Sequence, residues 1–179
     1  MRIYLTGFMG SGKTSVGKKI ANQLGYNFVD LDDFIEERHK ISIPGIFEKF
    51  DETAFRILEN KTLIQTFKFE KTVISTGGGT PCFHDNMKLM NQNGVTAYIK
   101  MHPKSLYHRL INSKKKRPLI MGKTEPELMA YIDQELTYRE PYYHKANIIL
   151  KGESLNLTSF YDDIHKIIEQ KKNELLINK

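Results

Sequence analysis

Gly7-Phe8-Met9-Gly10-Ser11-Gly12-Lys13-Thr14 is the stretch of sequence that decides the fold of this chain. It fits the pattern G-x-x-x-x-G-K-S/T and stands between a strand-like run and a segment with helical spacing, the context that a phosphate-binding loop requires. Its glycines let backbone N–H groups turn toward one point and form a cradle for phosphate oxygens. The start of the next helix adds the positive end of its dipole.

The last two residues of the motif supply the side chains that a nucleotide needs. Lys13 is expected to reach the β- and γ-phosphates of ATP, and the Thr14 hydroxyl to ligate Mg²⁺. The alternative is a glycine-rich turn that matches the pattern by chance, but the position between strand and helix favours a nucleoside triphosphate site. GTPases, motor ATPases and small-molecule kinases share this loop, so other residues must identify the reaction.

Around the motif, short β-rich runs alternate with amphipathic stretches, which is typical of a parallel sheet covered by helices. The predicted strands are residues 2–6, 27–30, 72–76, 96–100 and 147–150. No repeat or linker divides the chain, so we expect one α/β domain spanning residues 1–179.

The predicted helices carry recognisable ends. Val16, Ile20 and Leu24 share one face of the first helix, and Gly25 is its expected C-cap. A second helix is predicted over residues 51–67. A third begins with a capping box at residues 124–127, runs toward Arg139 and is expected to end at Pro141. The last helix places Phe160, Ile164, Ile167 and Ile168 on its apolar face.

The composition is that of a globular protein: 40% of the 179 residues are hydrophobic and 27% are charged, enough for a core without disulfides. The one cysteine, Cys82, excludes an internal disulfide and favours a reducing compartment. The first residues indicate a strand rather than a signal peptide, and no apolar run has the length of a membrane span. We therefore expect a cytoplasmic protein without a membrane partner.

The net charge of +6 has two explanations, nucleic-acid binding or the binding of small polyanions such as ATP. The basic residues gather in the run 114–117 and in the last helix, where Lys166, Lys171 and Lys172 are most simply a solvated face. The run itself has three interpretations: an ordinary surface loop, a nucleic-acid patch, or a lid whose Arg117 neutralises transferring phosphate.

Two carboxylates follow the second predicted strand, at the sheet edge where ligands of open α/β sheets bind. Alternation along the strand predicts that Asp30 and Asp32 point the same way, toward the phosphate loop. Asp30 then suits Mg²⁺ through a water, and Asp32 suits acceptance of a proton from a substrate hydroxyl. The alternative role is capping of the next helix, which is the simpler explanation for Asp33.

Arginines and glycines further along the chain point to an anionic acceptor. Arg56 and Glu59 lie three residues apart, which fits equally a surface ion pair or an arginine oriented to clamp an anion. Arg139 near a helix C-terminus is favourable for dipole reasons alone. Gly77-Gly78-Gly79 after the third strand allows close approach of a ligand to the backbone, although a flexible turn gives the same pattern.

Taken together, six segments resemble the shikimate kinase family, in the same order along nearly the whole chain. They are residues 7–14, Asp30-Leu31-Asp32, Phe55-Arg56-Ile57-Leu58-Glu59, Gly77-Gly78-Gly79, Arg117-Pro118-Leu119 and Arg139-Glu140-Pro141-Tyr142-Tyr143. The resemblance implies the three-layer P-loop fold of the nucleoside monophosphate kinase group, with a five-stranded parallel sheet in the order 2-3-1-4-5 flanked by helices, and a lid loop. It also implies that a monomer transfers the γ-phosphoryl of ATP to the 3-hydroxyl of shikimate, giving shikimate 3-phosphate and ADP on the route to chorismate and aromatic amino acids.

The resemblance also implies roles for individual residues. The residues that it assigns to ATP are Gly10, Ser11, Gly12, Lys13, Thr14, Ser15, Arg109, Arg117 and Asn156, with Thr14 and Asp30 at Mg²⁺. The residues that it assigns to shikimate are Asp32, Phe55, Arg56, Gly78, Gly79 and Arg139. Asp32, Lys13 and Arg117 are the implied catalytic residues, with a lid at about 113–123 and a substrate-binding helical region at about 32–62.

Three other functions fit part of the pattern. Nucleoside monophosphate kinases carry Asp-Gly-x-Pro-Arg after the third strand, where this chain has Ser75-Thr76-Gly77-Gly78-Gly79, and gluconate kinases lack the pairing of Arg56 with these glycines. A nucleic-acid-binding P-loop protein would use the run 114–117 and lose affinity steeply with salt. A non-catalytic regulatory homologue need not retain the full set of charged residues.

Overall fold

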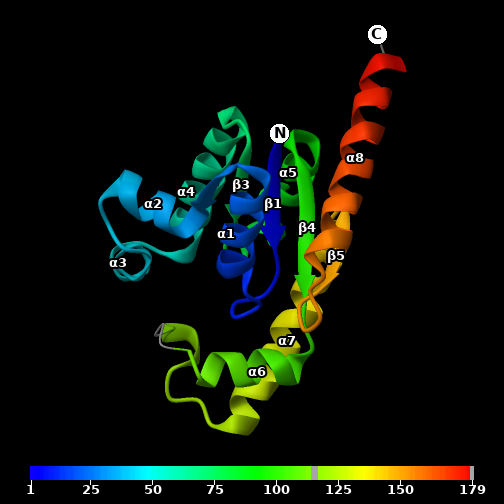
Figure 1. Ribbon diagram of the computed structural model, residues 1–179. Coiled ribbons are helices and arrows are strands. Elements are labelled where there is room, and N and C mark those ends of the chain that lie inside the picture. Colours follow the sequence, from blue (N-terminus) through cyan, green and yellow to red (C-terminus); the bar gives the residue numbers. More distant parts are fainter. Residues whose placement is uncertain (114–116, 178–179) are drawn as a thin grey trace.

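Five parallel strands form the centre of the computed structural model, which describes residues 1–113 and 117–177. They are β1 (Arg2–Thr6), β2 (Asn27–Asp30), β3 (Thr72–Ser75), β4 (Val95–Lys100) and β5 (Ile148–Lys151). Their order across the sheet is β2-β3-β1-β4-β5, which confirms the predicted order (Figure 1). The strand boundaries differ from the predicted ones by one residue at most.

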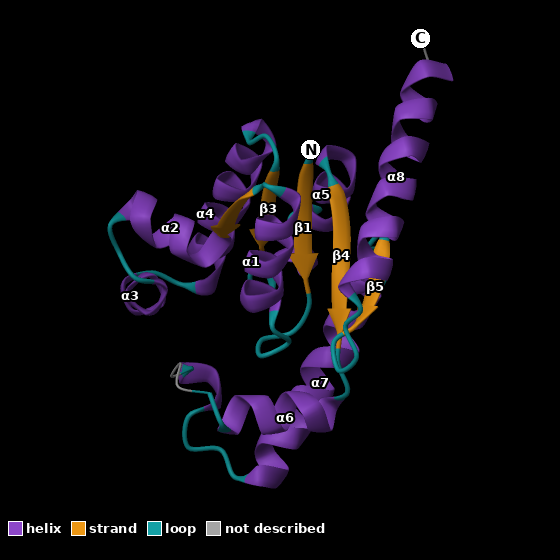
Figure 2. Cartoon of the chain, in the orientation of Figure 1, coloured by secondary structure: helices purple, strands orange, loops and turns teal. Residues whose placement is uncertain are grey.

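Helices cover the sheet and extend beyond it (Figure 2). They are α1 (Lys13–Leu24), α2 (Leu31–His39), α3 (Ile43–Lys49), α4 (Glu52–Gln65), α5 (Asn86–Asn93), α6 (Pro103–Ile111), α7 (Glu125–Tyr143) and α8 (Leu157–Ile177). Short 3₁₀ turns are η1 (Thr66–Lys68), η2 (Thr80–Cys82) and η3 (Pro118–Ile120). The basic residues 114–116 lie outside the described residues.

Alternate residues of β1 separate the core into two layers, as the two-residue period of a strand requires. Ile3 and Leu5 pack in a cluster with residues of α1 and α8, whereas Tyr4 packs in a second cluster with residues of α2 to α5. Together with the sheet, these clusters confirm the three-layer architecture. A third cluster joins Phe8 of the phosphate loop to α6 and α7.

The predicted end of the third helix was wrong. Pro141 lies inside α7, which continues to Tyr143, although the proline lacks an N–H for the helical ladder. The last turn is closed by the His144 N–H, which donates to Glu140 O at 2.9 Å. Tyr143 is fully buried, and its packing compensates for the missing hydrogen bond. The predicted capping box at Thr124 and Glu127 is present at the other end.

All five strands end on the same edge of the sheet, which faces the phosphate loop and the α6–α7 pair in Figure 2. At this edge, ligands of open parallel sheets bind where neighbouring connections leave in opposite directions. Here β1 lies between β3 and β4, so the loop after β1 lies at such a point. Among residues 1–113 and 117–177, no helix combines the length and apolar character that a membrane span needs.

Candidate active site

The loop between β1 and α1 has the backbone shape of a phosphate cradle. Gly10 and Gly12 have φ of 81° and 97°, the left-handed region that side chains disfavour. Lys13 is buried, and its Nζ donates to the carbonyl oxygens of Gly7 and Phe8 at 2.8 and 2.9 Å. The cavity over the loop is lined by Met9, Gly10, Gly12, Lys13, Thr14, Ser15, Asp30, Asp32, Ser75, Thr76, Gly77, Gly78, Arg109, Ser113 and Arg117.

Burial lowers the pKa of Lys13 to about 8, while the carboxylate of Asp32 opposes the shift. Above pH 8, Lys13 in the nucleotide-free protein therefore loses its proton, and the negative phosphates of a nucleotide would favour its return. We expect the affinity for metal-free ADP to fall by up to about tenfold per pH unit above pH 8, because binding then requires proton uptake. Titration calorimetry between pH 7 and 10, in buffers of different ionisation enthalpy, measures both quantities.

Lys13→Met should remove the proton uptake and flatten the pH dependence of whatever affinity remains. Lys18→Met is the matched control, because Lys18 is an exposed lysine on the same helix, and it should keep the wild-type slope. An unchanged slope in Lys13→Met would assign the titration to another group.

Thr14 and Asp30 meet beside the loop. The Thr14 hydroxyl donates to Asp30 Oδ2 at 2.8 Å, and Ser75 Oγ lies 3.5 Å from the same hydroxyl. These are the oxygen donors that Mg²⁺ prefers, and Mg²⁺ is usually held by one or two protein groups together with waters and substrate phosphates. The residues present therefore fit the predicted metal site.

The prediction that Asp32 continues the second strand was wrong, although its predicted position beside the phosphate loop was right. β2 ends at Asp30, and Asp32 lies in the first turn of α2 rather than on the strand. Asp30 is the N-cap: its Oδ1 accepts from the Asp32 N–H at 3.2 Å. A helical turn thus places Asp32 beside Asp30, and both line the cavity over the phosphate loop.

Two further arginines reach the phosphate loop. Arg109 of α6 donates from Nη1 to Ser11 O at 3.0 Å, so α6 is tied to the cradle. Arg117 is half-buried, which lowers its pKa, while Asp32 opposes this shift. Within the part of the chain that the structure describes, Arg117 Nε and Ser11 Oγ are buried without a hydrogen-bond partner. Two such donors beside the cradle fit an anionic ligand.

Two predicted nucleotide contacts, Ser11 and Asn156, do not line this cavity, and of these Asn156 lies away from the phosphate loop. Its side-chain oxygen accepts from the backbone N–H groups of Thr158 and Ser159, at the start of α8. The structure gives it a capping role, and its contact with a nucleotide stays a prediction.

A second cavity of about 250 Å³ adjoins the first, with room for a small molecule. Its lining combines apolar side chains with charged ones: Met9, Asp32, Asp33, Glu36, Ile43, Pro44, Phe47, Phe55, Arg56, Glu59, Gly77, Gly78, Gly79, Arg117, Leu119 and Arg139. Phe55 is buried in one wall, 4.8 Å from the Phe47 ring. Met9, Asp32, Gly77, Gly78 and Arg117 line both cavities, so the two are continuous.

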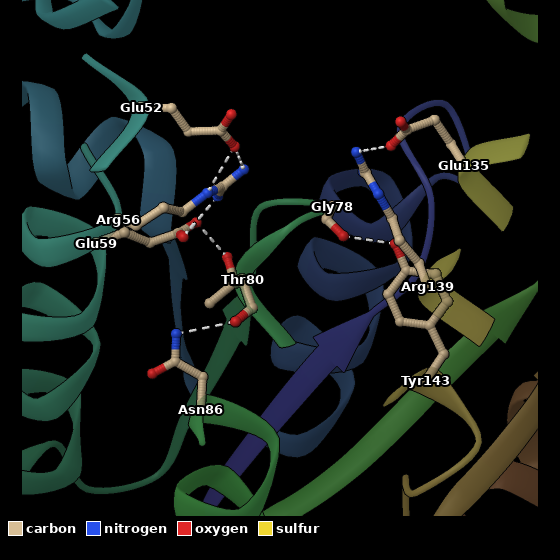
Figure 3. Close-up of polar contacts among 9 residues, drawn as sticks. All are labelled: Glu52, Arg56, Glu59, Gly78, Thr80, Asn86, Glu135, Arg139 and Tyr143. Atoms are coloured by element: carbon tan, nitrogen blue, oxygen red, sulfur yellow. Dashed lines mark hydrogen bonds and ion pairs between the residues drawn. The ribbon is translucent and has the colours of Figure 1, made fainter. Parts of the chain in front are cut away.

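Arg56 is held rigidly in the second cavity (Figure 3). Its Nη1 donates to Glu59 Oε2 at 2.7 Å, its Nη2 lies 3.1 Å from Glu52 Oε1, and its guanidinium stacks 4.2 Å from the centre of the Phe83 ring. Glu59 is 1% exposed and also accepts from the Thr80 hydroxyl at 2.5 Å. The interpretation of Glu59 as an orienting group is therefore preferred to a surface ion pair.

Arg139 approaches from the other side, on α7. It pairs with Glu135, and its guanidinium lies 5.5 Å from the centre of the Phe8 ring in the phosphate loop. Burial acts to lower the pKa of Arg139, but Tyr143 and Glu135 outweigh it, so the pKa is raised and the guanidinium stays charged. The two arginines therefore place two fixed cations in one small cavity.

Each glycine of residues 77–79 lies against a different charged side chain. A Cβ on Gly77 would lie 2.9 Å from Glu59 Oε1, one on Gly78 3.3 Å from Arg139 Nη1, and one on Gly79 2.5 Å from Arg56 Nη2. Gly79 has φ of −89°, which any residue adopts, so the requirement there is space rather than backbone freedom. The run allows the charged groups to converge on the loop.

Gly79→Ala should therefore displace the Arg56 guanidinium and raise the KM for an anionic acceptor by about tenfold, the size expected for loss of one charge-assisted contact. The KM for ATP should stay within about twofold, because Gly79 does not line the phosphate cavity. Gly25→Ala is a control for destabilisation away from the cavities: its φ of 64° disfavours a Cβ, but no atom lies within 4 Å of where that Cβ would be. Equal KM values for Gly79→Ala and wild type would refute the steric argument.

Comparison with known proteins decides the family. A family model described as shikimate kinase matches residues 9–172. The chain belongs to the shikimate kinase family. A shikimate kinase from Bacteroides thetaiotaomicron is 45% identical over 155 residues, which cover 87% of this chain and 89% of that protein.

Solved structures of shikimate kinases superpose on nearly the whole chain. The crystal structure of the Bacteroides thetaiotaomicron shikimate kinase has a TM-score of 0.84 and 41% identity, and covers 96% of this chain and 98% of that one. A shikimate kinase from Acinetobacter baumannii, solved in complex with shikimate, has a TM-score of 0.76 and 32% identity, and covers 99% of this chain and 94% of that one. The family resemblance stated from the six segments is confirmed.

Sequence reasoning missed the residues that hold Arg56 and Arg139 in place. Glu52 and Glu135 pair with Arg56 and Arg139 at i,i+4 spacing, a signal that was readable in both helices. Thr80 and Asn86 had no such signal. The Asn86 side chain donates to Thr80 O at 2.9 Å, which stabilises η2 beneath Glu59, and only the fold brings these residues together.

Proposed function

We propose that the protein transfers the γ-phosphoryl of ATP to the 3-hydroxyl of shikimate, forming shikimate 3-phosphate and ADP. The observation that carries this proposal is the continuity of the two cavities: a phosphate cradle opens directly into a pocket with two fixed arginines. Shikimate carries a carboxylate for the arginines and hydroxyls for the opposite side. The complex of the Acinetobacter baumannii relative with shikimate supports the same acceptor.

The ATP phosphates are proposed to bind the backbone of residues 10–15, with Lys13 and Arg117 stabilising charge on the transferred group. Lys13 Nζ now donates to loop carbonyls and would be redirected toward phosphate oxygens. Arg109 is proposed to contact the adenine side, since it is anchored to Ser11. Thr14 and Asp30 would hold Mg²⁺, which would help to neutralise the charge of the phosphates when bound.

Asp32 is proposed to bind the acceptor hydroxyl and to take its proton as transfer proceeds. Asp32 lines both cavities, which supports this role. Arg56 and Arg139 are proposed to bind the shikimate carboxylate, the Gly78 and Gly79 backbone the ring hydroxyls, and Phe55 one side of the ring.

Release of ADP from Mg-ATP tests the proposal, measured with shikimate and, in parallel, with gluconate and nucleoside monophosphates. Strong stimulation by shikimate alone is expected. Stimulation by gluconate or a nucleotide instead would identify another kinase of the same fold. No stimulation by any of them would refute the proposed reaction, and salt-dependent nucleic-acid binding would then be measured.

The protein is also proposed to act as a cytoplasmic monomer. The presence of a single cysteine, which cannot form an internal disulfide, supports a reducing compartment. Cys82 is buried, and burial raises the pKa of its thiol to about 11. Sedimentation analysis of the purified protein measures the oligomeric state.

A further inference from the structure

A buried tyrosine hydroxyl bonds to the backbone that lines the second cavity. Tyr143 is the last residue of α7 and is fully buried. Its hydroxyl donates to the carbonyl oxygen of Gly78 at 2.5 Å (Figure 3). Buried tyrosine hydroxyls generally find a partner, so the bond alone implies no function. The identity of the partner implies a function, because Gly78 lines both cavities.

Arg139 lies one turn earlier on α7, and Tyr143 contributes to the raised pKa of its guanidinium. Gly78 and Arg139 approach each other closely, since a Cβ on Gly78 would lie 3.3 Å from Arg139 Nη1. Three groups therefore meet at one junction: the glycine loop after β3, the guanidinium of Arg139 and the hydroxyl of Tyr143. The tyrosine lines neither cavity, and its hydroxyl bonds to the Gly78 carbonyl that lies against Arg139.

The tyrosine ring is fixed on its far side. The ring of Tyr98 on β4 packs 4.9 Å from that of Tyr143 at an interplanar angle of 35°, and both are buried. Burial also raises the pKa of Tyr143 far above its usual value, so its hydroxyl remains a hydrogen-bond donor throughout the pH range of an assay. A donor that neither moves nor ionises is suited to holding a carbonyl in one position.

Arg56 is held by a separate set of residues. Its guanidinium is positioned by Glu59, which in turn accepts from Thr80. Figure 3 shows the two groups on either side of the glycine loop, with Gly78 on the side of Arg139 and Thr80 on the side of Arg56. Loss of the Tyr143 hydroxyl should therefore affect the Arg139 side of the cavity and leave the Arg56 side in place.

We propose that Tyr143 is a positioning residue for the acceptor substrate, whose hydroxyl holds the Gly78 backbone and the Arg139 guanidinium at a fixed spacing. The inference rests on the proposed function, because shikimate is the ligand that would span the two groups with its ring hydroxyls and its carboxylate. The role goes beyond the packing of a core tyrosine: it links binding of one end of the substrate to binding of the other.

Tyr143→Phe tests this role, because it removes the hydroxyl and keeps the ring. The KM for shikimate is expected to rise about tenfold, as for loss of one hydrogen bond to a positioned group, whereas kcat at saturating shikimate and the KM for ATP should each stay within about threefold of wild type. Tyr98→Phe is the matched control: it removes a buried hydroxyl from the same ring stack, away from Gly78, and should leave both KM values unchanged. The affinity for ADP, measured by calorimetry, reports whether each variant is folded.

The outcomes separate the inference from the proposed function. If wild type does not phosphorylate shikimate, the proposed function fails and the inference fails with it. If wild type does and Tyr143→Phe has an unchanged KM for shikimate, the inference alone is overturned. Equal increases in the KM values for shikimate and ATP, or loss of ADP binding, would show that Tyr143 stabilises the core rather than positioning the acceptor. A rise confined to the KM for shikimate supports the proposal.

Discussion

Asp32→Asn is expected to lower kcat by about 10²–10⁴-fold, the range for loss of a positioned general base. The amide cannot accept the proton of the acceptor hydroxyl, yet it keeps the size of the carboxylate in the first turn of α2. The affinity for ADP should change little, because the phosphate cradle is made by loop backbone and Lys13. Single-turnover measurements with both substrates saturating, together with calorimetry of ADP, distinguish the two effects.

Glu37→Gln is the matched control, since it removes an exposed carboxylate from the same helix outside both cavities. It should behave as wild type. Asp32 also interacts with Lys13 and Arg117, so a fall in ADP affinity in Asp32→Asn would indicate an electrostatic role in nucleotide binding. A variant that keeps kcat within about threefold of wild type would show that transfer to the hydroxyl needs no carboxylate base.

The phosphate loop and the sheet were predictable because local pattern and tertiary fold agree there. The motif at residues 7–14 requires a strand before it and a helix after it, and the structure has both. Alternating strands and helices then allow few topologies, since parallel connections are right-handed. The strand order itself came from the family resemblance rather than from the pattern.

Sequence reasoning failed where a short-range rule was used to fix the end of a strand or a helix. Asp30 and Asp32 were expected to share a strand, but Asp30 caps α2 and Asp32 lies in the helix. Pro141 was expected to end α7, but burial of Tyr143 outweighs the missing hydrogen bond. At Asp30 a local capping interaction ends the strand, whereas at Pro141 tertiary packing outweighs the local preference.

The residues that support the arginine side of the site from other elements were harder to predict, because their contacts join positions far apart in sequence. Glu59 orients Arg56 from the same helix, but the Thr80 hydroxyl that fixes Glu59 comes from residues after β3. The bond between Tyr143 and Gly78 joins residues 65 positions apart. No spacing rule connects such pairs, so only the fold reveals them.

Removal of either arginine is expected to cause the second large effect, a loss of shikimate binding. Arg139→Ala should lower kcat/KM for shikimate by a factor of about 30 to 700, which corresponds to a loss of about 2–4 kcal/mol of transition-state stabilisation. The reason is that the substrate carboxylate would lose a charged partner in a half-enclosed cavity. Arg139→Lys should recover only part of this, since an ammonium lacks the planar fork. Arg38→Ala, on the exposed end of α2, is the charge-matched control and should change neither substrate's KM.

Arg56→Ala should show the same kinetic loss and, in addition, a lower free energy of unfolding. Glu59 is 1% exposed and would keep a buried charge without its cation. Adding Glu59→Gln to Arg56→Ala removes that charge, so the double variant should recover stability in denaturant unfolding but not affinity for shikimate. Recovery of both would mean that Arg56 acts only through the stability of α4. Recovery of stability alone would separate the substrate contact of Arg56 from its role in the fold, which is the distinction that the carboxylate clamp requires.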